Sequence, residues 1–217
     1  MTSISHHLDE VILLDYHRGR LNAGQTLLVE THLEMCPHCR MSLRLFDAIG
    51  ASMLDEVLPV DMSDDALELA LARIERPEEA PEPRVAPELP AYLKGIELPE
   101  SVRAAAFKPR YWGAPGVWMA HLDAPKDGRG LTYLMYVKGG MQMPVHDHQG
   151  LEMTLVLSGC FSDDRGAYHP GDCVSCDEGD HHSPLIASDD CLCLIAANAP
   201  IAPKTLLGKL LQPFARI

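Results

Sequence analysis

The chain has 217 residues, 47% apolar and 23% charged, which is the composition of a globular protein and excludes global disorder. Its formal net charge of −13 argues against direct binding of nucleic acid, because a phosphate backbone requires a basic surface. No apolar run approaches the ~20 residues of a membrane helix, and the N-terminus lacks the pattern of a signal peptide. We therefore expect a cytoplasmic protein without membrane contact.

Local patterns in the first 75 residues predict four short helices, over residues 8–18, 22–35, 37–58 and 66–75. Gly19 is suited to end the first helix, and Asn22 can cap the second. Pro37 suits the first position of the third helix, and Ser63 before two aspartates resembles the cap of the fourth. Four such helices bury only a small core, so we expect an additional cross-link that stabilises this part of the chain.

Residues 76–90 contain five Pro and four Glu, which predicts an extended linker between two domains. The first domain, residues 1–75, carries 13 acidic and 5 basic residues, so most of the negative charge lies there. The second domain, residues 91–217, contains apolar runs separated by turn residues, at 116–122, 131–137, 151–159 and 191–197. Short strands with such turns predict a β-sandwich or barrel.

The helical part contains the spacing His32-x3-Cys36-x2-Cys39. His32 and Cys36 are four residues apart, which places them on one face of a helix, and Cys-x2-Cys can hold one tetrahedral ion. Two thiolates and an imidazole favour zinc. The fourth ligand could come from one of several histidines, namely His6, His7, His17 or His38.

Two other interpretations of Cys36 and Cys39 are weaker. The pair could be buried and inert, although the added histidine argues against this. A thioredoxin-like redox pair normally follows a strand, whereas the surroundings here are helical throughout.

A second pattern lies in the β part, where His146 and His148 are two apart and share one face of a strand. Glu152 has the same parity, and His182, favoured over His181 on spacing, could add a fourth ligand from another strand. Three imidazoles and a carboxylate suit zinc or another divalent metal such as iron, manganese or nickel. Such a site can be structural and closed or open and catalytic.

These residues resemble two known sequence families. The first segment of the β part matches the cupin motif G-x5-H-x-H-x3-E-x6-G throughout, and the second matches G-x5-P-x-G-x2-H-x3-N except at Asp177 and Ile186. The helical spacing resembles the H-x3-C-x2-C core of zinc-binding anti-sigma domains. Together with the segments LVETHLEMCPHCR, HQGLEMTLVLSG, DCLCL and KLLQPFARI, the chain is similar to the ChrR group of anti-sigma factors over nearly its whole length.

The resemblance implies an α + β two-domain fold, with a four-helix zinc-binding domain and an antiparallel β-barrel of cupin type. It implies zinc ligation by His7, His32, Cys36 and Cys39, and a divalent metal at His146, His148, Glu152 and His182. It further implies a protein without enzymatic activity that forms a 1:1 complex with an extracytoplasmic-function sigma factor. The sigma factor would be released when the cupin domain senses reactive oxygen, including singlet oxygen.

Two other functions remain open from the residues alone. A cupin of this type could be a metal-dependent dioxygenase with a helical accessory domain, or a redox or metal sensor for another partner. The pair Cys173 and Cys176 could be a redox element, although core packing is the more ordinary interpretation. A catalytic cupin has no need of the helical Cys/His pattern, and this favours the anti-sigma hypothesis.

Overall fold

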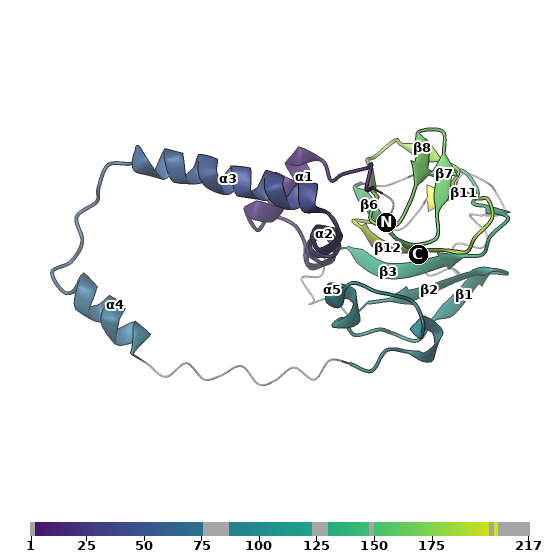
Figure 1. Ribbon diagram of the computed structural model, residues 1–217, viewed down its shortest axis with the longest axis horizontal. Helices are drawn as coiled ribbons and strands as arrows, with labels where there is room; N and C mark the ends of the chain where they lie inside the picture. The colour runs from purple at the N-terminus through teal and green to yellow at the C-terminus, as the bar shows by residue number, and fades with distance from the viewer. Residues whose placement is uncertain (1–2, 76–86, 123–129, 148–149, 200–201, 204–217) are drawn as a thin grey trace.

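The computed structural model describes residues 3–75, 87–122, 130–147, 150–199 and 202–203. His148, most of the predicted linker at 76–90 and the C-terminal KLLQPFARI segment lie outside the described residues. Figure 1 shows a helical N-terminal part followed by antiparallel β-sheets, as predicted.

The four predicted helices are present, followed by two short ones: α1 Glu10–His17, α2 Ala23–Met35, α3 Pro37–Asp55, α4 Ala66–Ile74, a 3-10 helix Ala91–Leu93 and α5 Glu100–Arg103. Gly19, just after α1, has a φ of 64°, and Asn22 forms a capping box with Gln25 at the start of α2. The predicted cap at Ser63 is wrong. Asp65 is the N-cap residue of α4. Ser63 instead begins a turn that precedes the helix, in which Ala66 N donates a hydrogen bond to the Ser63 carbonyl.

The described residues of the β part form thirteen strands: β1 Tyr111–Ala114, β2 Val117–His121, β3 Leu131–Val137, β4 Met141–Gln142, β5 His146–Asp147, β6 Glu152–Ser158, β7 Phe161–Asp163, β8 Gly166–Tyr168, β9 Cys173–Cys176, β10 His181–His182, β11 Leu185–Ile186, β12 Cys191–Ala197 and β13 Ala202–Pro203. The largest sheet has the order β1-β2-β3-β12-β6-β9, and all its pairs are antiparallel. Smaller sheets, β10-β5-β13 and β4-β11-β7-β8, complete the barrel.

Strand β12 is buried along its whole length. Cys191, Cys193 and Ile195 belong to the apolar cluster inside the barrel, together with Tyr133, Val156 and Phe161. Leu192 and Leu194 belong instead to the cluster that includes α1 and α2 residues. The run CLCLIAA therefore lacks polar alternation because the helices cover the outer face of this strand.

Helix α2 packs on β12, β6, β3 and α5, so the helical part and the barrel share one core. Glu34 on α2 accepts bonds from the backbone N–H groups of Glu100 (2.7 Å) and Ser101 (2.8 Å), which gives α5 a side-chain cap from another element. At the other end of α2, Gln25 donates to Asn198 Oδ1 over 3.1 Å. These bonds tie one end of α2 to α5 and the other end to the residue that follows β12.

The rest of the helical part extends away from this core. Cys39, in the first turn, is the only buried residue of α3, and α4 has none. In Figure 1 α3 points away from the barrel and α4 lies beyond its far end. Among the described residues, no helix is both long and apolar enough to span a bilayer.

Candidate metal centres

Four predicted residues come together where α2, α3 and the N-terminal segment meet. The ligand atoms of His7, His32, Cys36 and Cys39 all lie within 4.8 Å of one another. His7 Nδ1 lies 3.3 Å from Cys36 Sγ, and His32 Nε2 lies 3.2 Å from Cys39 Sγ. Zinc in tetrahedral coordination holds such nitrogen and sulfur atoms about 3.6 Å apart, so the spacing and the donor chemistry both fit zinc. These four residues are named the Cys–His cluster below.

The local sequence explains this arrangement. Cys36 is both the C-cap residue of α2 and the N-cap residue of α3, and Pro37 is the first residue of α3. Its Sγ accepts a bond from Cys39 N over 3.4 Å, which turns both sulfurs toward the same point. His32 lies one turn before Cys36 on α2 and is fully buried.

The surroundings of the cluster disfavour charged side chains. Burial lowers the pKa of His32 to about 4, an effect that the Gly171 carbonyl opposes. That contact falls short of a hydrogen bond, and the described residues give His32 Nδ1 no other partner. Burial also lowers the pKa of His7, with His38 adding to the effect, and burial raises the pKa of the Cys39 thiol. Neutral imidazoles are the form that binds metal, whereas the Cys39 thiol must lose its proton to do so.

The other candidate histidines are placed elsewhere. His6 lies against the Tyr168 ring, with centroids 4.5 Å apart, and its Nδ1 is 3.5 Å from a carboxylate oxygen of Asp172. His38 stacks on the His7 ring at 4.2 Å, and His17 contacts Asp47 on α3. The structure therefore brings His7, rather than these three, into the Cys–His cluster.

A second group lies in the barrel, where His146, Glu152 and His182 are buried with their ligand atoms within 4.8 Å of one another. His146 and His182 face each other across the β5–β10 pair, and Glu152 begins β6. His148, the fourth predicted ligand, lies outside the described residues, and His181 is exposed. We call His146, Glu152 and His182 the barrel cluster.

The imidazoles of the barrel cluster are arranged as in a metal site. His146 Nδ1 is 2.9 Å from the Pro144 carbonyl, and the two Nε2 atoms are 3.2 Å apart. Nitrogens on one tetrahedral metal are separated by about 3.3 Å at ordinary bond lengths, so this donor set fits a divalent ion. A cavity of about 420 Å³ lies beside the cluster and is lined by residues that include Asp163, His182 and Ser183.

Sequence patterns missed three residues beside the two clusters. Asp172 holds the N-terminal segment that carries His7, and Asp163 and Arg165 lie behind His182. None of the three belongs to a motif with the spacing of metal ligands. Asp172 bonds to residues far away in the sequence, and the bond between Asp163 and Arg165 forms only because the chain turns tightly between them.

The cysteines outside the Cys–His cluster are all buried except Cys160, and the sulfurs of Cys191 and Cys193 lie 3.6 Å apart in the barrel.

Comparison with known proteins identifies both parts of the chain. Residues 102–202 match the family described as "ChrR Cupin-like domain", and residues 12–40 match the family described as "Putative zinc-finger". The predicted cupin type of the barrel is thereby confirmed, and the zinc-finger match together with the Cys–His cluster indicates zinc in the helical part.

Two relatives match over nearly the whole length. The anti-sigma-E factor ChrR of Cereibacter sphaeroides is 35% identical over 221 residues, which cover 99% of this chain and 100% of the relative. The crystal structure of Rhodobacter sphaeroides SigE in complex with the anti-sigma ChrR matches with a TM-score of 0.66 and 33% identity, covering 90% of this chain and 99% of that one. This chain therefore belongs to the ChrR family of anti-sigma factors.

Proposed function

We propose that this chain is a cytoplasmic anti-sigma factor that binds an extracytoplasmic-function sigma factor in a 1:1 complex and prevents its use by RNA polymerase. The relatives named above are an anti-sigma-E factor and a SigE–ChrR complex, which supports this partner class. The family supports a regulatory function and gives no support to the alternative of a cupin dioxygenase.

An exposed apolar surface on α3 carries the proposal. Four residues spaced by four form one face of the helix and are exposed by 49 to 69%: Met41, Leu45, Ile49 and Met53. We call them the apolar face of α3. Helix α4 adds Leu67, Leu71 and Ile74, which are also exposed. Continuous apolar surface of this kind is characteristic of a protein interface, because its exposure to water is unfavourable.

The charge around this surface favours a basic protein partner. Residues 1–75 carry 13 acidic and 5 basic residues, and the acidic residues include Glu68 on α4 and Asp61, Asp64 and Asp65 just before it. An acidic surface attracts the basic surface that a DNA-binding protein presents, and it repels nucleic acid itself. The apolar face would supply affinity, while the acidic side chains would guide association.

Zinc in the Cys–His cluster would fix the start of α3, the helix that carries the proposed interface. The cluster joins the N-terminal segment to α2 and to the first turn of α3, so zinc there would fix the direction in which α3 leaves the barrel. A structural zinc site contributes ~10–16 kcal/mol of apparent binding energy, much more than a helix pair of this size obtains from burial.

The barrel would carry the regulatory function. Residues 91–217 contain the barrel cluster, which we assign to a divalent metal held by His146, Glu152 and His182 with His148 as fourth ligand. We assign to this domain the response to reactive oxygen that releases the sigma factor, with residues 1–75 as the binding domain. Two metals per chain, one in each part, are expected from elemental analysis.

A binding titration of the full-length chain with a purified extracytoplasmic-function sigma factor from the same genome tests the proposal. Ile49→Asp should weaken the complex at least about 30-fold, because it removes roughly 1 kcal/mol of further apolar burial and adds the cost of burying a carboxylate. Ala51→Asp is the matched control, since it adds the same charge to an exposed site about 200° further round the same helix.

The expected result is a stable 1:1 complex that inhibits transcription in a reconstituted assay, and that is weakened at least about 30-fold in Ile49→Asp but unchanged in Ala51→Asp. Failure of every such sigma factor of the organism to bind the zinc-loaded chain would refute the function. Equal loss of binding in the two variants would instead show that the apolar face of α3 is not the interface.

A further inference from the structure

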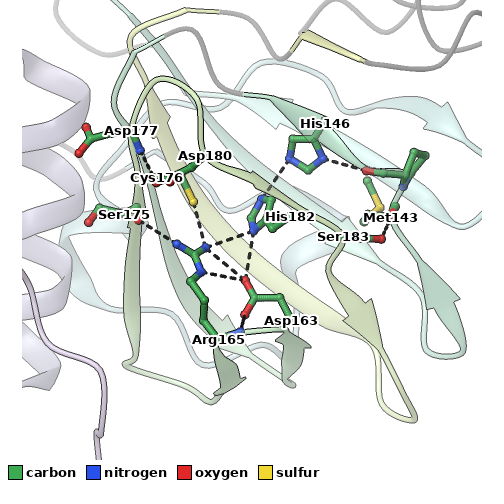
Figure 2. A network of polar contacts seen from close by, with 11 residues as sticks. Met143, His146, Asp163, Arg165, Ser175, Cys176, Asp177, Asp180, His182 and Ser183 are labelled. Atoms are coloured by element: carbon green, nitrogen blue, oxygen red, sulfur yellow. Dashed lines mark hydrogen bonds and ion pairs between the residues drawn. The ribbon is translucent and has the colours of Figure 1, made fainter.

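A buried carboxylate stands directly behind one of the imidazoles of the barrel cluster. The Asp163 side chain is 0% exposed, and its Oδ2 lies 3.2 Å from His182 Nδ1. Asp163 ends β7, and His182 belongs to β10, so the pair joins two of the smaller sheets. Figure 2 shows this carboxylate on the side of His182 that faces away from His146.

The carboxylate is held by several donors, as a buried charge requires. Arg165 donates from its backbone N to Asp163 Oδ1 over 2.9 Å and from Nη2 to Oδ2 over 3.2 Å. Asp163 Oδ2 is therefore placed to accept the imidazole proton of His182 Nδ1.

This contact determines which nitrogen of His182 faces the cluster. When Nδ1 donates to Asp163, Nε2 carries the lone pair, and this atom lies 3.2 Å from His146 Nε2. His146 follows the same rule, because its Nδ1 can donate to the Pro144 carbonyl over 2.9 Å. Both imidazoles thus present Nε2 to one point (Figure 2).

Arg165 limits the alternatives open to His182. Its Nη2 is also 3.3 Å from His182 Nδ1, and it donates to Cys176 Sγ over 3.1 Å. An imidazole that accepted from Arg165 at Nδ1 would carry its proton on Nε2 and could not bind a metal there. The Arg165 guanidinium is engaged by Asp163 and Cys176, which leaves the proton of His182 Nδ1 to Asp163.

We propose that Asp163 is the positioning residue of the barrel metal site, fixing His182 as the Nε2 ligand, and that Arg165 in turn positions Asp163. The inference rests on the proposed metal site in the barrel. Outer carboxylates that orient a ligating histidine typically contribute 10- to 100-fold to metal affinity.

Cobalt binding to the full-length chain tests the proposal, because Co²⁺ reports the two sites separately. A thiolate-to-cobalt charge-transfer band marks the Cys–His cluster, whereas cobalt in the barrel cluster gives only weaker visible bands, since no cysteine belongs to it. Asp163→Asn should weaken cobalt binding in the barrel 10- to 100-fold and leave the thiolate band unchanged. Asp164→Asn, which removes the same charge from the exposed neighbouring residue, should bind as the wild type does.

Nitrogen NMR of the zinc-loaded chain gives a readout that a purely structural role would not change. In the wild type His182 should be protonated at Nδ1 alone, and in Asp163→Asn this signal should shift or become a mixture of tautomers. An Asp163→Asn affinity within twofold of the wild type would overturn the proposal, as would an equal loss at both clusters.

Two further outcomes separate the possible failures. If Asp163→Asn does not fold, Arg165→Gln changes a partly exposed side chain, and an unchanged barrel affinity in that variant would overturn the proposal. If the wild-type chain shows only the thiolate band and takes up one cobalt, the barrel metal site itself is wrong and the proposed role of Asp163 falls with it.

Discussion

The bonds of Asp172 predict that the barrel supports the Cys–His cluster. Asp172 is 1% exposed and lies in the turn that precedes β9. Its Oδ1 accepts from the backbone N–H groups of Ser5 (2.7 Å) and His6 (2.9 Å), and its Oδ2 accepts from His169 N over 2.8 Å. The next residue, His7, is a member of the cluster, so a barrel carboxylate holds the segment that delivers one of its imidazoles.

Asp172→Asn removes part of this support. The amide oxygen can keep two of the three bonds, but the amide nitrogen then faces a third N–H donor. Losing one charge-assisted bond and leaving a buried donor unpaired costs about 2–3 kcal/mol. If this loss destabilises the position of the segment that carries His7, the zinc affinity of the Cys–His cluster should drop by about 30-fold or more.

The dependence of the free energy of unfolding on pH should change as well, at acidic pH. Burial raises the pKa of Asp172, but the three backbone N–H groups outweigh it and hold the pKa below its usual value. The stabilising contribution is therefore complete above about pH 4 and is lost as the pH falls through the lower, folded-state pKa. Asp172→Asn should remove this part of the acid dependence.

Zinc competition with a chromophoric chelator, combined with urea unfolding, measures both effects. Asp189→Asn is the control, because it removes the same charge from an exposed site. Lower stability with unchanged zinc affinity would refute the argument, since it would limit Asp172 to a role within the barrel.

Three further predictions concern the helical part. Cys36→Ala should lower the zinc content by one per chain and reduce helicity in circular dichroism together with sigma-factor binding; unchanged helicity and binding would contradict the assigned role of zinc. Glu34→Ala should cost about 1–2 kcal/mol in urea unfolding because α5 loses its cap, whereas the exposed Glu30→Ala should cost much less. A fragment of residues 1–75 should still bind the sigma factor but melt at a lower temperature than in the full chain, because the buried Leu28 and Val29 lose their barrel contacts.

The Cys–His cluster was predictable because three of its four members lie within one helical junction. The spacing from His32 to Cys39 and the cap at Cys36 are local, so sequence alone places these side chains together. The choice of His7 required the resemblance, since it depends on how Asp172 holds a distant segment. Neither Ser5 nor Asp172 is part of a pattern that sequence spacing could detect.

The barrel was predictable only in part. The longest strands follow the apolar runs, including β3 and β12, whereas strands of two residues such as β5 and β10 are too short to show periodicity. The contact of Asp163 with His182 could not be foreseen, because it joins two small sheets whose relative packing the sequence does not reveal. The cover of β12 by helices was likewise hidden, since an apolar run fits burial inside a barrel equally well.

Strand β9 gives the two clusters a direct physical connection. At its first residue, Cys173 N donates to the His6 carbonyl over 3.0 Å, next to the segment that carries His7. At its last residue, Cys176 pairs with Glu152 of the barrel cluster and accepts from Arg165. Four residues of extended chain cover only ~13 Å, so β9 spans the distance with no intervening element.

This connection makes the two aspartate variants complementary. Asp163 binds Arg165, which contacts Cys176 at the barrel end of β9, and Asp172 precedes the other end, beside the Cys–His cluster. If a change at the proposed barrel metal site reaches, through β9, the helices that we propose to bind the sigma factor, then Asp172→Asn should uncouple the two clusters while leaving metal affinity in the barrel intact. A chain in which Asp172→Asn weakens zinc binding but releases the sigma factor normally in response to oxidant would show that the signal travels by another route, such as the packing of α2 on β12.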